Sequence, residues 1–538
     1  MPAADVEVLI VGGGLAGLSA AAFLSHQGVS PMLVERRDAP LPLPRARAFS
    51  PRTIELFRPL GLAEPMLACA GRSALSTFNE VVRAETVAGP EIFWQRREEA
   101  EARAASHSPV GWWVAADQPE LESLIEEFVR DHGANVRYGT ELVSFGVESD
   151  GVRAELAQGG KRSQVRAKYL VAADGYRAGI RRTLGVGETG AGDIATVLNI
   201  VFRADLSALL GERRPGWVFV DHPRPGSVLT PLRLPDQWVL MVPYPPGEGE
   251  RIAATSAEAC AAMVRGAVGS GQVAIEVLPA AGRRAAPAQI WHSGSWVADR
   301  FRAGPVLFAG DAAHVMQPAG GLGASTGIQD VHNLAWKLAA VLRADAGERL
   351  LDTYEAERRP VGLISMEQAM LRGREKEGGG SAESGLIDEA ALVFGFRYRS
   401  AAVVREDPGQ EAVVPAERLT GQPGTRAPHV ELLDGTRRIS TLDLFGDRFV
   451  LLTDAAAGDR WHEACAELST GLKGGLTCHR IGLDLTDPGG RWRYAYGVGS
   501  HGAALVRPDG VVCWRSVGGV GDHKRRLHQV LRQVLARP

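Results

Sequence analysis

The stretch VEVLIVGGGLAGLSAAAFL, residues 6–24, carries the clearest structural signal in this chain. Val6–Val11 is a run rich in β-branched residues, which is typical of a buried parallel strand. Leu15–Gln27 predicts a helix that ends at Gly28, and Pro31–Glu35 predicts a second strand. Together these segments predict a strand–helix–strand unit of about 30 residues.

The glycines between the first strand and the helix have the G-x-G-x-x-G spacing of a dinucleotide-binding turn. Gly12 permits the tight turn, Gly14 lets a pyrophosphate approach the backbone, and Gly17 allows close packing of helix on strand. Glu35 ends the second strand, where a carboxylate can accept hydrogen bonds from an adenosine ribose. The pattern predicts a dinucleotide site without distinguishing NAD from FAD. The residues expected at this site are Gly12, Gly14, Leu15, Ala16, Gly17, Glu35 and Arg36.

A second motif, far downstream, favours FAD. Val306–Ala309 is a hydrophobic strand that leads into Gly310-Asp311, and a glycine-rich loop, Pro318–Gly323, follows. FAD is longer than NAD and needs a second contact region, where a carboxylate suits the ribityl hydroxyls; the alternative role for Asp311 is a helix N-cap. The loop precedes a helix expected to begin near Gly327, whose positive end favours an anionic reduced flavin. The residues expected at this second region are Gly310, Asp311, Pro318, Gly321, Leu322 and Gly323.

Farther along, the chain divides into ranges of different character. We expect an α/β fold in which residues 1–175 and 301–400 form the FAD-binding domain, the first range with inserted antiparallel strands and the second with long helices. Residues 176–300 are strand-rich and predict an antiparallel sheet domain for the substrate. Residues 418–538 predict a separate α/β unit, and Glu375–Gly385 predicts a flexible segment before it.

Composition is typical of a soluble globular protein. Hydrophobic residues make up 45% and charged residues 23%, and the net charge of −3 includes no basic stripe, so no nucleic-acid partner is expected. Val8–Leu24 is apolar, but Asp5 and Glu7 before it carry the wrong charge for a signal peptide, and glycines interrupt it. We therefore expect a cytoplasmic protein without a membrane partner. Five scattered cysteines without a CxxC pair argue against a disulfide framework or a metal site.

The order of three motifs, GGGLAG, Ala173-Asp174-Gly175 and Ala309-Gly310-Asp311, resembles the class A flavoprotein aromatic hydroxylases, the family of p-hydroxybenzoate hydroxylase. The stretch AGDAAH with its PAGGLG loop and the terminal Val506–Gly510 (VRPDG) are similar to the actinobacterial polyketide hydroxylases, which include aklavinone hydroxylase. The resemblance covers essentially the whole chain. It implies a Rossmann-like FAD-binding domain, an antiparallel-sheet substrate domain and a C-terminal thioredoxin-like domain.

The resemblance also implies the activity. The chain would be an FAD-dependent monooxygenase that uses NADPH or NADH as a transient reductant and O₂ as co-substrate. A flavin C4a-hydroperoxide would hydroxylate an aromatic polycyclic substrate, phenolic or quinonoid and polyketide-derived. No second glycine fingerprint is expected for the nicotinamide cofactor, which this family binds only transiently. A Baeyer–Villiger or antibiotic-modifying monooxygenase, or a poorly oxidising flavoprotein that binds a labile intermediate, are the alternatives, and both a monomer and a homodimer are compatible with the sequence.

Several side chains are candidates for the cofactor and substrate sites. The resemblance implies that Arg45, Gln118 and Asp174 lie near FAD. A base or a positive charge near the substrate would favour attack on a phenolate. The candidates for that role are His222, Tyr244, Arg372 and Arg374, each with a surface or packing role as the alternative. His314, beside the second FAD motif, is expected to be structural.

The C-terminal unit resembles a thioredoxin-like domain in the order of its predicted elements. Thioredoxin chemistry needs a CxxC pair in which one thiolate has a depressed pKa. Cys465 and Cys478 are too far apart in sequence for such a pair. We therefore expect a role in packing or in a dimer contact, without redox chemistry.

Overall fold

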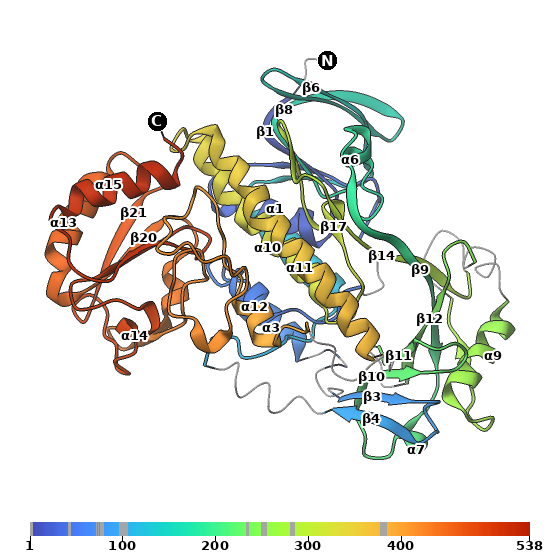
Figure 1. Ribbon diagram of the computed structural model, residues 1–538. Coiled ribbons are helices and arrows are strands. Elements are labelled where there is room, and N and C mark those ends of the chain that lie inside the picture. The colour runs from blue at the N-terminus through green and yellow to red at the C-terminus, as the bar shows by residue number, and fades with distance from the viewer. Residues whose placement is uncertain are drawn as a thin grey trace.

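The computed structural model shows three sheet-based parts arranged around two long central helices (Figure 1). The residues it describes are 4–40, 45–71, 73, 75, 80–95, 106–232, 236–248, 256–279, 286–376 and 385–537. Most of the segment predicted to be flexible, Glu375–Gly385, and Pro44 beside Arg45 lie outside these residues. Within the described residues, no helix is both long and apolar enough to cross a membrane.

The first part is the predicted strand–helix–strand unit, extended into a larger sheet. The order of its main path is β15-β16-β8-β1-β2-β5, and β1 pairs in parallel with both β2 and β8. Its strands are β1 (Ala4–Val11), β2 (Met32–Val34), β5 (Asn135–Arg137), β6 (Thr140–Glu148), β7 (Gly151–Gln158), β8 (Lys161–Ala172), β15 (Arg302–Ala303) and β16 (Val306–Phe308). Buried aliphatic residues of β1, β2, β8 and β16 form the core of the molecule, as their sequences predicted.

The helices of this part cover the sheet and surround its carboxyl edge. They are α1 (Leu15–His26), α2 (Pro51–Glu55), α3 (Ala63–Ala70), α5 (Gln118–Asp131), α6 (Gly179–Thr183), α10 (Leu322–Leu342) and α11 (Asp352–Lys376). Helix α10 begins at Leu322 and not near Gly327, because Gly321 has a φ of 67° and starts the helix as its N-cap. The predicted positive helix end therefore lies within the glycine-rich loop itself.

The inserted antiparallel strands are β6, β7 and the first half of β8. One continuous strand, β8, thus serves both the antiparallel insertion and the parallel sheet. Alternation along β8 explains this: its first half is open on one face, and its last residues are buried on both.

The second part is a mostly antiparallel sheet with the order β17-β14-β9-β12-β11-β10-β3-β4. Its strands are β3 (Glu80–Ala84), β4 (Glu91–Gln95), β9 (Glu188–Arg203), β10 (Pro215–Val220), β11 (Ser227–Pro231), β12 (Gln237–Tyr244), β13 (Glu276–Val277), β14 (Gln289–Ala298) and β17 (His314–Val315). Two helices accompany it, α7 (Ser207–Leu210) and α9 (Ala257–Val268). Strands β3, β4 and β17 come from ranges predicted for the FAD-binding domain, so the chain crosses between the two sheets more often than the predicted division of 1–175, 176–300 and 301–400 implies.

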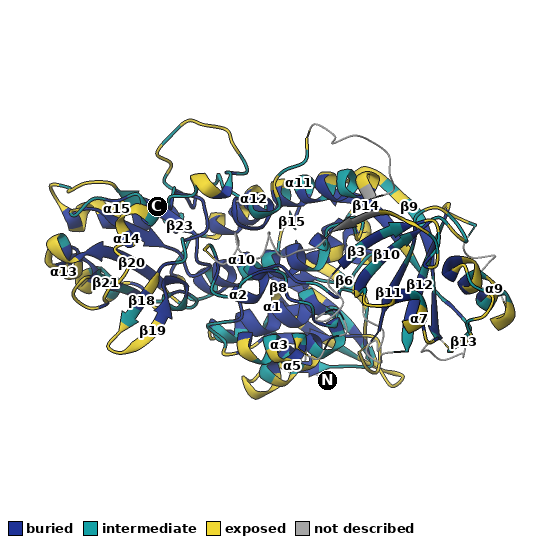
Figure 2. Ribbon diagram, turned by 90° about the horizontal axis from the view of Figure 1, so that it is seen from below, coloured by how far each residue is buried: buried dark blue, intermediate teal, exposed yellow. Residues whose placement is uncertain are grey.

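The third part follows α12 (Glu389–Phe394) and contains a four-stranded sheet, order β21-β20-β22-β23. Its elements are β18 (Glu431–Asp434), β19 (Arg437–Ser440), β20 (Phe449–Asp454), α13 (Gly458–Ser469), β21 (Leu476–Ile481), α14 (Trp492–Tyr496), β22 (Ala503–Val506), β23 (Val512–Ser516) and α15 (His523–Val534). Figure 2 shows the strands of the four-stranded sheet largely buried, whereas the β18–β19 hairpin and the outer faces of the helices are exposed. Packing of α13 on β21 brings Cys465 against Cys478, two thiols that are distant in sequence.

Candidate functional site

The glycine turn lies between the end of β1 and the start of α1. Gly12 has a φ of 114°, and a Cβ on Gly17 would lie 1.9 Å from the Gly12 carbonyl oxygen. At Gly14 the nearest atoms to an added Cβ are Glu122 Oε1 at 3.9 Å and Arg45 Nη2 at 4.0 Å. The fold therefore requires glycine at positions 12 and 17, whereas Gly14 leaves its backbone open to a ligand.

Two helices begin at this region with a glycine N-cap. Gly14 caps α1 and Gly321 caps α10, and neither helix receives a side-chain capping bond. The first backbone N–H groups of an α-helix have no partner within the helix and carry its positive end. Both helix starts therefore suit anionic or electron-rich groups, and Leu322 and Gly323 lie at the second of them.

The two glycine motifs, far apart in sequence, touch in the structure. A Cβ on Gly310 would lie 2.8 Å from the Cβ of Ala16, and a Cβ on Gly327 would lie 2.9 Å from the Gly310 Cα. Only small residues allow α10 to approach the turn this closely. This contact places Asp311, the next residue after Gly310, beside the glycine turn.

Asp311 has an exposed side chain that nevertheless lies deep among protein atoms. Its surroundings raise the pKa of the Asp311 carboxyl through burial, and the charges of Arg45 and His314 partly oppose this. Its side chain is therefore accessible to a ligand while lying beside the glycine turn. The alternative N-cap role is not observed, since Ala309 is the N-cap of the short 3₁₀ turn Gly310–Ala312.

Arg45 and Gln118 come together with a residue that the sequence reasoning missed, Glu122. The Gln118 side-chain oxygen accepts a hydrogen bond from the Ala46 N–H at 3.0 Å, and its Nε2 donates to Glu122 Oε1 at 2.7 Å. Arg45 Nη2 lies 3.9 Å from the same carboxylate oxygen. Burial raises the pKa of Glu122 in spite of these partners. Its spacing of four residues from Gln118 on a helix was the signal in the sequence.

Glu35 accepts two hydrogen bonds from backbone N–H groups. Its Oε2 accepts from Gly13 at 2.8 Å, and its Oε1 accepts from Arg37 at 2.9 Å. The carboxylate therefore ties the end of β2 to the glycine turn. Arg36 is exposed beside it.

Asp174 follows β8 and lies against the same turn. Its Oδ2 accepts a hydrogen bond from the Ile180 N–H at 3.0 Å, at the start of α6. Its Oδ1 is buried and has no partner among the described residues. Burial raises the pKa of the Asp174 carboxyl, and backbone donors including Ile180 only partly oppose this. An acceptor without a partner at this place suits a donor from a bound molecule.

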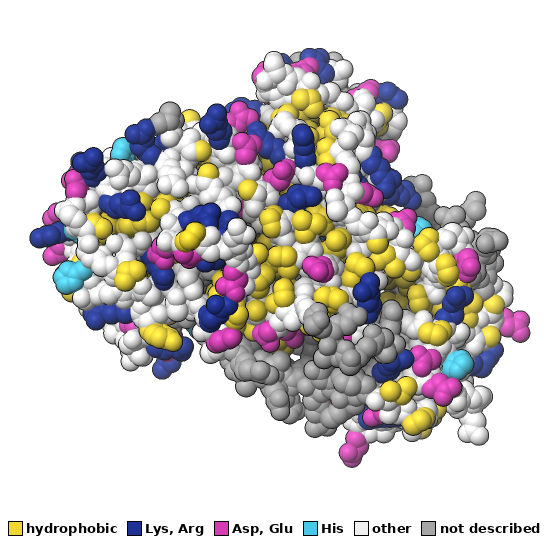
Figure 3. Space-filling model, in the orientation of Figure 1, with side chains coloured by type: hydrophobic (Ala, Val, Ile, Leu, Met, Phe, Trp, Pro, Cys, Tyr) yellow, Lys and Arg dark blue, Asp and Glu magenta, His cyan; other side chains and the backbone are white. Residues whose placement is uncertain are grey.

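The glycine-rich loop Pro318–Gly323 has an apolar setting. A Cβ on Gly321 would lie 3.4 Å from the Trp113 ring, and one on Gly323 would lie 3.6 Å from the Met316 side chain. The Trp113 Nε1 is buried without a partner among the described residues. Pro318 is exposed at the start of the loop. Figure 3 shows hydrophobic side chains gathered in the middle of the molecule, between the C-terminal unit and the second sheet.

The second sheet presents two different faces. Leu198, Leu240 and their neighbours pack against α9 and are fully buried. Alternation places the next residues of each strand on the opposite face, which is only half buried. Thr230 of that face accepts a hydrogen bond from Arg47 at 3.0 Å, so the face is turned toward the first part of the fold. We call it the open sheet face; its half-buried residues are Asn199, Trp217, Phe219, Val228, Met241 and Trp291.

The structure separates the four candidates for the substrate site. Arg372 lies at the glycine-rich loop, where its Cδ is 3.2 Å from the position of a Cβ on Gly320. Tyr244 belongs to the core cluster that packs against α9, on the sheet face opposite to the open one. His222 is exposed and pairs with a glutamate, and Arg374 is exposed on α11. Of these four candidates, only Arg372 therefore lies close to the glycine-rich loop.

His314 and the remaining glycine patterns have structural positions. His314 is buried, and its Nε2 lies 2.6 Å from Asp330 Oδ2, as the expected structural role requires. The G-x-G-x-x-G spacing recurs at residues 185–190 and 497–502, contrary to the expectation of a single fingerprint. The first leads from α6 into β9 and the second from α14 into β22, so neither links a buried strand to a helix. Within the described ranges, no group of three metal-ligating side chains is found.

Comparison with known proteins gives matches along almost the whole chain. Residues 5–369 match the family described as "FAD binding domain", and residues 420–538 match "Aromatic-ring hydroxylase, C-terminal". Aklavinone 12-hydroxylase of Streptomyces purpurascens is 37% identical, with 99% of each chain covered. The 4-methyl-5-nitrocatechol 5-monooxygenase of a Burkholderia species is 38% identical over 100% of this chain and 98% of the relative. A ternary complex of aklavinone-11 hydroxylase with FAD and aklavinone has a TM-score of 0.91 and 36% identity, with both chains fully covered.

Proposed function

The chain belongs to the family of FAD-dependent aromatic-ring hydroxylases, and on this basis we propose that it hydroxylates a polycyclic phenol or quinone with NAD(P)H and O₂. One oxygen atom enters the ring and the other leaves as water, with two electrons from NAD(P)H. FAD, when bound, supplies the transfer of those electrons to O₂. The observation that carries the proposal is the contact between the Gly12–Gly17 turn and the Gly310-Asp311 motif. The open sheet face, whose half-buried residues are mostly apolar, accompanies this contact.

The residues present fit FAD along its length. We assign the pyrophosphate to the Gly12–Gly17 turn, where Gly14 is open, and the adenosine ribose to Glu35. Asp311 is assigned to the ribityl hydroxyls because its side chain is exposed beside the glycine turn. The start of α10 is assigned to the electron-rich edge of the flavin ring. Arg45, Gln118 and Asp174 are assigned to the same cofactor region by their contacts with these elements.

The open sheet face is the proposed wall of the substrate site. Its aromatic and thioether side chains give a broad apolar surface for fused rings. Trp291 is held by a hydrogen bond of 2.9 Å from its Nε1 to Asn199 Oδ1, so its ring orientation is fixed. Arg372 borders the glycine-rich loop, where burial lowers its pKa and nearby carboxylates oppose the shift. We assign it to the stabilisation of a phenolate.

Rapid flavin reduction is expected only with a suitable substrate present. The reason is that the described residues form no dedicated nicotinamide domain, so productive hydride transfer depends on the substrate-bound arrangement. Stopped-flow mixing with NADPH or NADH should show reduction at least about tenfold faster, equal to 1.4 kcal/mol of barrier, with an aklavinone-type polycycle than without substrate. Label from ¹⁸O₂ in the product then identifies hydroxylation, and equal reduction rates with and without every substrate tested would refute the proposal.

Two variants test the assigned wall in the same assay. Trp291→Ala removes an aromatic surface from the open face and should raise the KM for the polycycle. Tyr244→Phe is the matched control, because Tyr244 lies on the other face against α9. A nitrocatechol in the panel tests a single-ring substrate instead. A larger effect of Tyr244→Phe than of Trp291→Ala would contradict the assignment of faces.

We also propose that the C-terminal unit is thioredoxin-like and has no thiol chemistry. The supporting observations are the parallel pair β20–β21 joined by α13, then the antiparallel β22–β23 hairpin and α15. The contact with Cys478, together with burial, raises the pKa of Cys465, and burial raises the pKa of Cys513. Neutral thiols are poor nucleophiles. All five cysteines are buried and none forms a disulfide, which supports a reducing, cytoplasmic location.

Replacing Cys465, Cys478 and Cys513 together with alanine should leave turnover within a few-fold of the wild type. The expected cost is packing, about 1–2 kcal/mol for each buried site. Turnover and thermal unfolding of the triple variant measure the two effects separately. A variant that keeps its FAD and its fold but no longer hydroxylates would restore a redox role for these thiols.

A further inference from the structure

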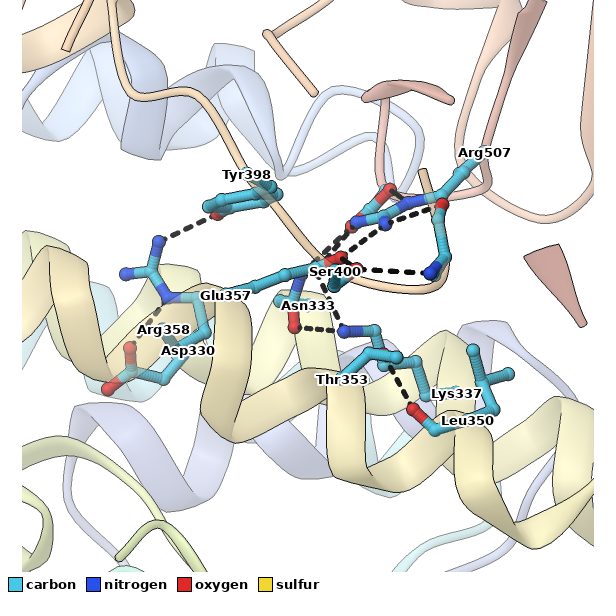
Figure 4. A network of polar contacts seen from close by, with 12 residues as sticks. Asp330, Asn333, Lys337, Leu350, Thr353, Glu357, Arg358, Tyr398, Ser400 and Arg507 are labelled. Carbon is cyan, nitrogen blue, oxygen red and sulfur yellow. Dashed lines mark hydrogen bonds and ion pairs between the residues drawn. The ribbon is translucent and has the colours of Figure 1, made fainter. Parts of the chain in front are cut away.

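The sequence Arg507-Pro508-Asp509-Gly510 forms the turn between β22 and β23, and the Arg507 side chain points toward Glu357 of α11 (Figure 4). Arg507 is fully buried and Asp509 is 3% exposed. Arg507 donates two hydrogen bonds to Glu357 of α11, at 2.6 Å to Oε1 and 2.9 Å to Oε2. It also donates to both carboxylate oxygens of Asp509, at 3.0 and 2.6 Å. We call this segment the RPDG turn.

Helix α10 completes the cluster around the RPDG turn. Asn333 Nδ2 donates to Asp509 Oδ2 at 3.1 Å and to Glu357 Oε2 at 2.7 Å. Lys337 Nζ donates to Glu357 Oε2 at 2.8 Å. The buried cluster contains two cations and two carboxylates, so its charges balance. Burial raises the pKa of Glu357, but Arg507 and Lys337 outweigh it and hold the pKa below its usual value.

Helices α10 and α11 also connect the cluster to the Gly310-Asp311 motif. Arg358, next to Glu357 on α11, donates from Nε to Asp330 Oδ1 at 2.8 Å. Asp330 Oδ2 accepts from the Gly310 N–H at 3.3 Å and lies 2.6 Å from His314 Nε2. Asp330 therefore holds the backbone of the residue before Asp311. Asp330 and Asn333 lie three residues apart on one face of α10 and connect this motif to the cluster.

Tyr398 lies between the two halves of the network. Its hydroxyl accepts a hydrogen bond from Arg358 Nη1 at 2.8 Å. The guanidinium carbon of Arg507 lies 5.8 Å from the Tyr398 ring centre, and that of Arg358 lies 6.0 Å from it. Cations at this distance from an aromatic ring are attracted to it. A continuous path of contacts thus runs from the RPDG turn through the half-buried Tyr398 and through Arg358 to Asp330 and Gly310.

We propose that the RPDG turn of the C-terminal unit positions the Gly310-Asp311 loop for FAD through this network. The inference rests on the FAD site proposed above. Buried hydrogen-bonded ion pairs tolerate little displacement, because each unpaired charge is costly away from water. The C-terminal unit thereby helps to hold the cofactor site in place. Coupling of this kind is reciprocal, so bound FAD also stabilises the folded conformation of the RPDG turn.

A network that only holds the two units together would affect stability without affecting FAD affinity. Arg507→Lys keeps the charge but removes the paired hydrogen bonds, and Tyr398→Phe removes a single hydroxyl in the middle of the path. The matched control is Arg58→Lys. Arg58 pairs with Asp443 of the C-terminal unit at 2.7 and 3.0 Å, across the same interface but away from this network.

The measurements are the Kd of FAD for each apoprotein and the thermal unfolding of each apoprotein. Arg507→Lys and Tyr398→Phe should weaken FAD binding at least about five-fold, the lower end of coupling between linked sites. Arg58→Lys should leave the Kd within about two-fold of the wild type, whatever it does to unfolding. An unchanged Kd in both network variants, with unfolding lowered as in Arg58→Lys, overturns the proposal.

Hydrogen exchange of the wild-type chain tests the reverse direction and does not depend on any variant folding. Adding FAD to the apoprotein should slow amide exchange in residues 503–516 as well as in residues 306–330. Slowing confined to residues 306–330 overturns the proposal while leaving the FAD site intact. A wild-type chain that binds no FAD would instead refute the proposed function, so the two failures are distinguishable.

Discussion

Asp311→Ala is expected to lose most of its FAD on purification. The ribityl hydroxyls would lose a charged acceptor, and hydrogen bonds to charged groups contribute about 1.5–3 kcal/mol. This corresponds to about a ten- to 150-fold weaker Kd, since each 1.4 kcal/mol is a factor of ten. The measurement is the flavin-to-protein absorbance ratio of the purified variant, followed by titration of the apoprotein with FAD.

Two features of the structure make this test specific. The Asp311 side chain is exposed, so its removal should leave the unfolding of the apoprotein nearly unchanged. Asp311→Asn is the matched control, because it keeps an acceptor oxygen without the charge and should lose less FAD than the alanine variant. Full FAD occupancy in Asp311→Ala would remove this residue from the cofactor site.

Gly14→Ala and Gly17→Ala are expected to differ in the stability of the apoprotein. At Gly17 an added Cβ would lie 1.9 Å from the Gly12 carbonyl oxygen, so the β1–α1 packing must shift. Overpacking of this kind costs about 1–3 kcal/mol or more of stability. At Gly14 the nearest atom is 3.9 Å away, so the apoprotein should keep its stability within about 1 kcal/mol. The new methyl group instead occupies the approach of the pyrophosphate to the backbone.

Comparison of these two variants distinguishes a glycine that the fold needs from a glycine that FAD binding needs. Apoprotein melting temperatures should fall for Gly17→Ala and not for Gly14→Ala, whereas FAD affinity should fall for both. The expected loss for Gly14→Ala is about 1–3 kcal/mol of binding, the cost of overpacking a fitted site. Gly14→Ala with wild-type affinity for FAD would show that the pyrophosphate does not approach the turn at this residue.

The sequence alone determined the elements whose signals are local. The run of β-branched residues in β1, the glycine spacing after it and the hydrophobic strand before Gly310 follow from short-range steric and burial rules, and the structure confirmed these elements. Of the residues expected near FAD, Arg45, Gln118 and Asp311 lie close to one another in the structure, and their contact with FAD stays a prediction. Helix α10 was predicted to begin five residues too late, because the left-handed Gly321 that starts it has no periodic signal of its own.

Only the tertiary structure decided which residues share a neighbourhood. Alternation shows that Tyr244 and Met241 lie on opposite faces of one strand. Which face is buried depends on the packing of α9, which covers the face that carries Tyr244. Glu122 became a site residue through Arg45, about 80 positions earlier in the chain. The burial of Arg507 in the RPDG turn could not be predicted, because it depends on Glu357 of α11 and on Lys337 of α10. Such long-range partners balance a charge only once the chain has folded.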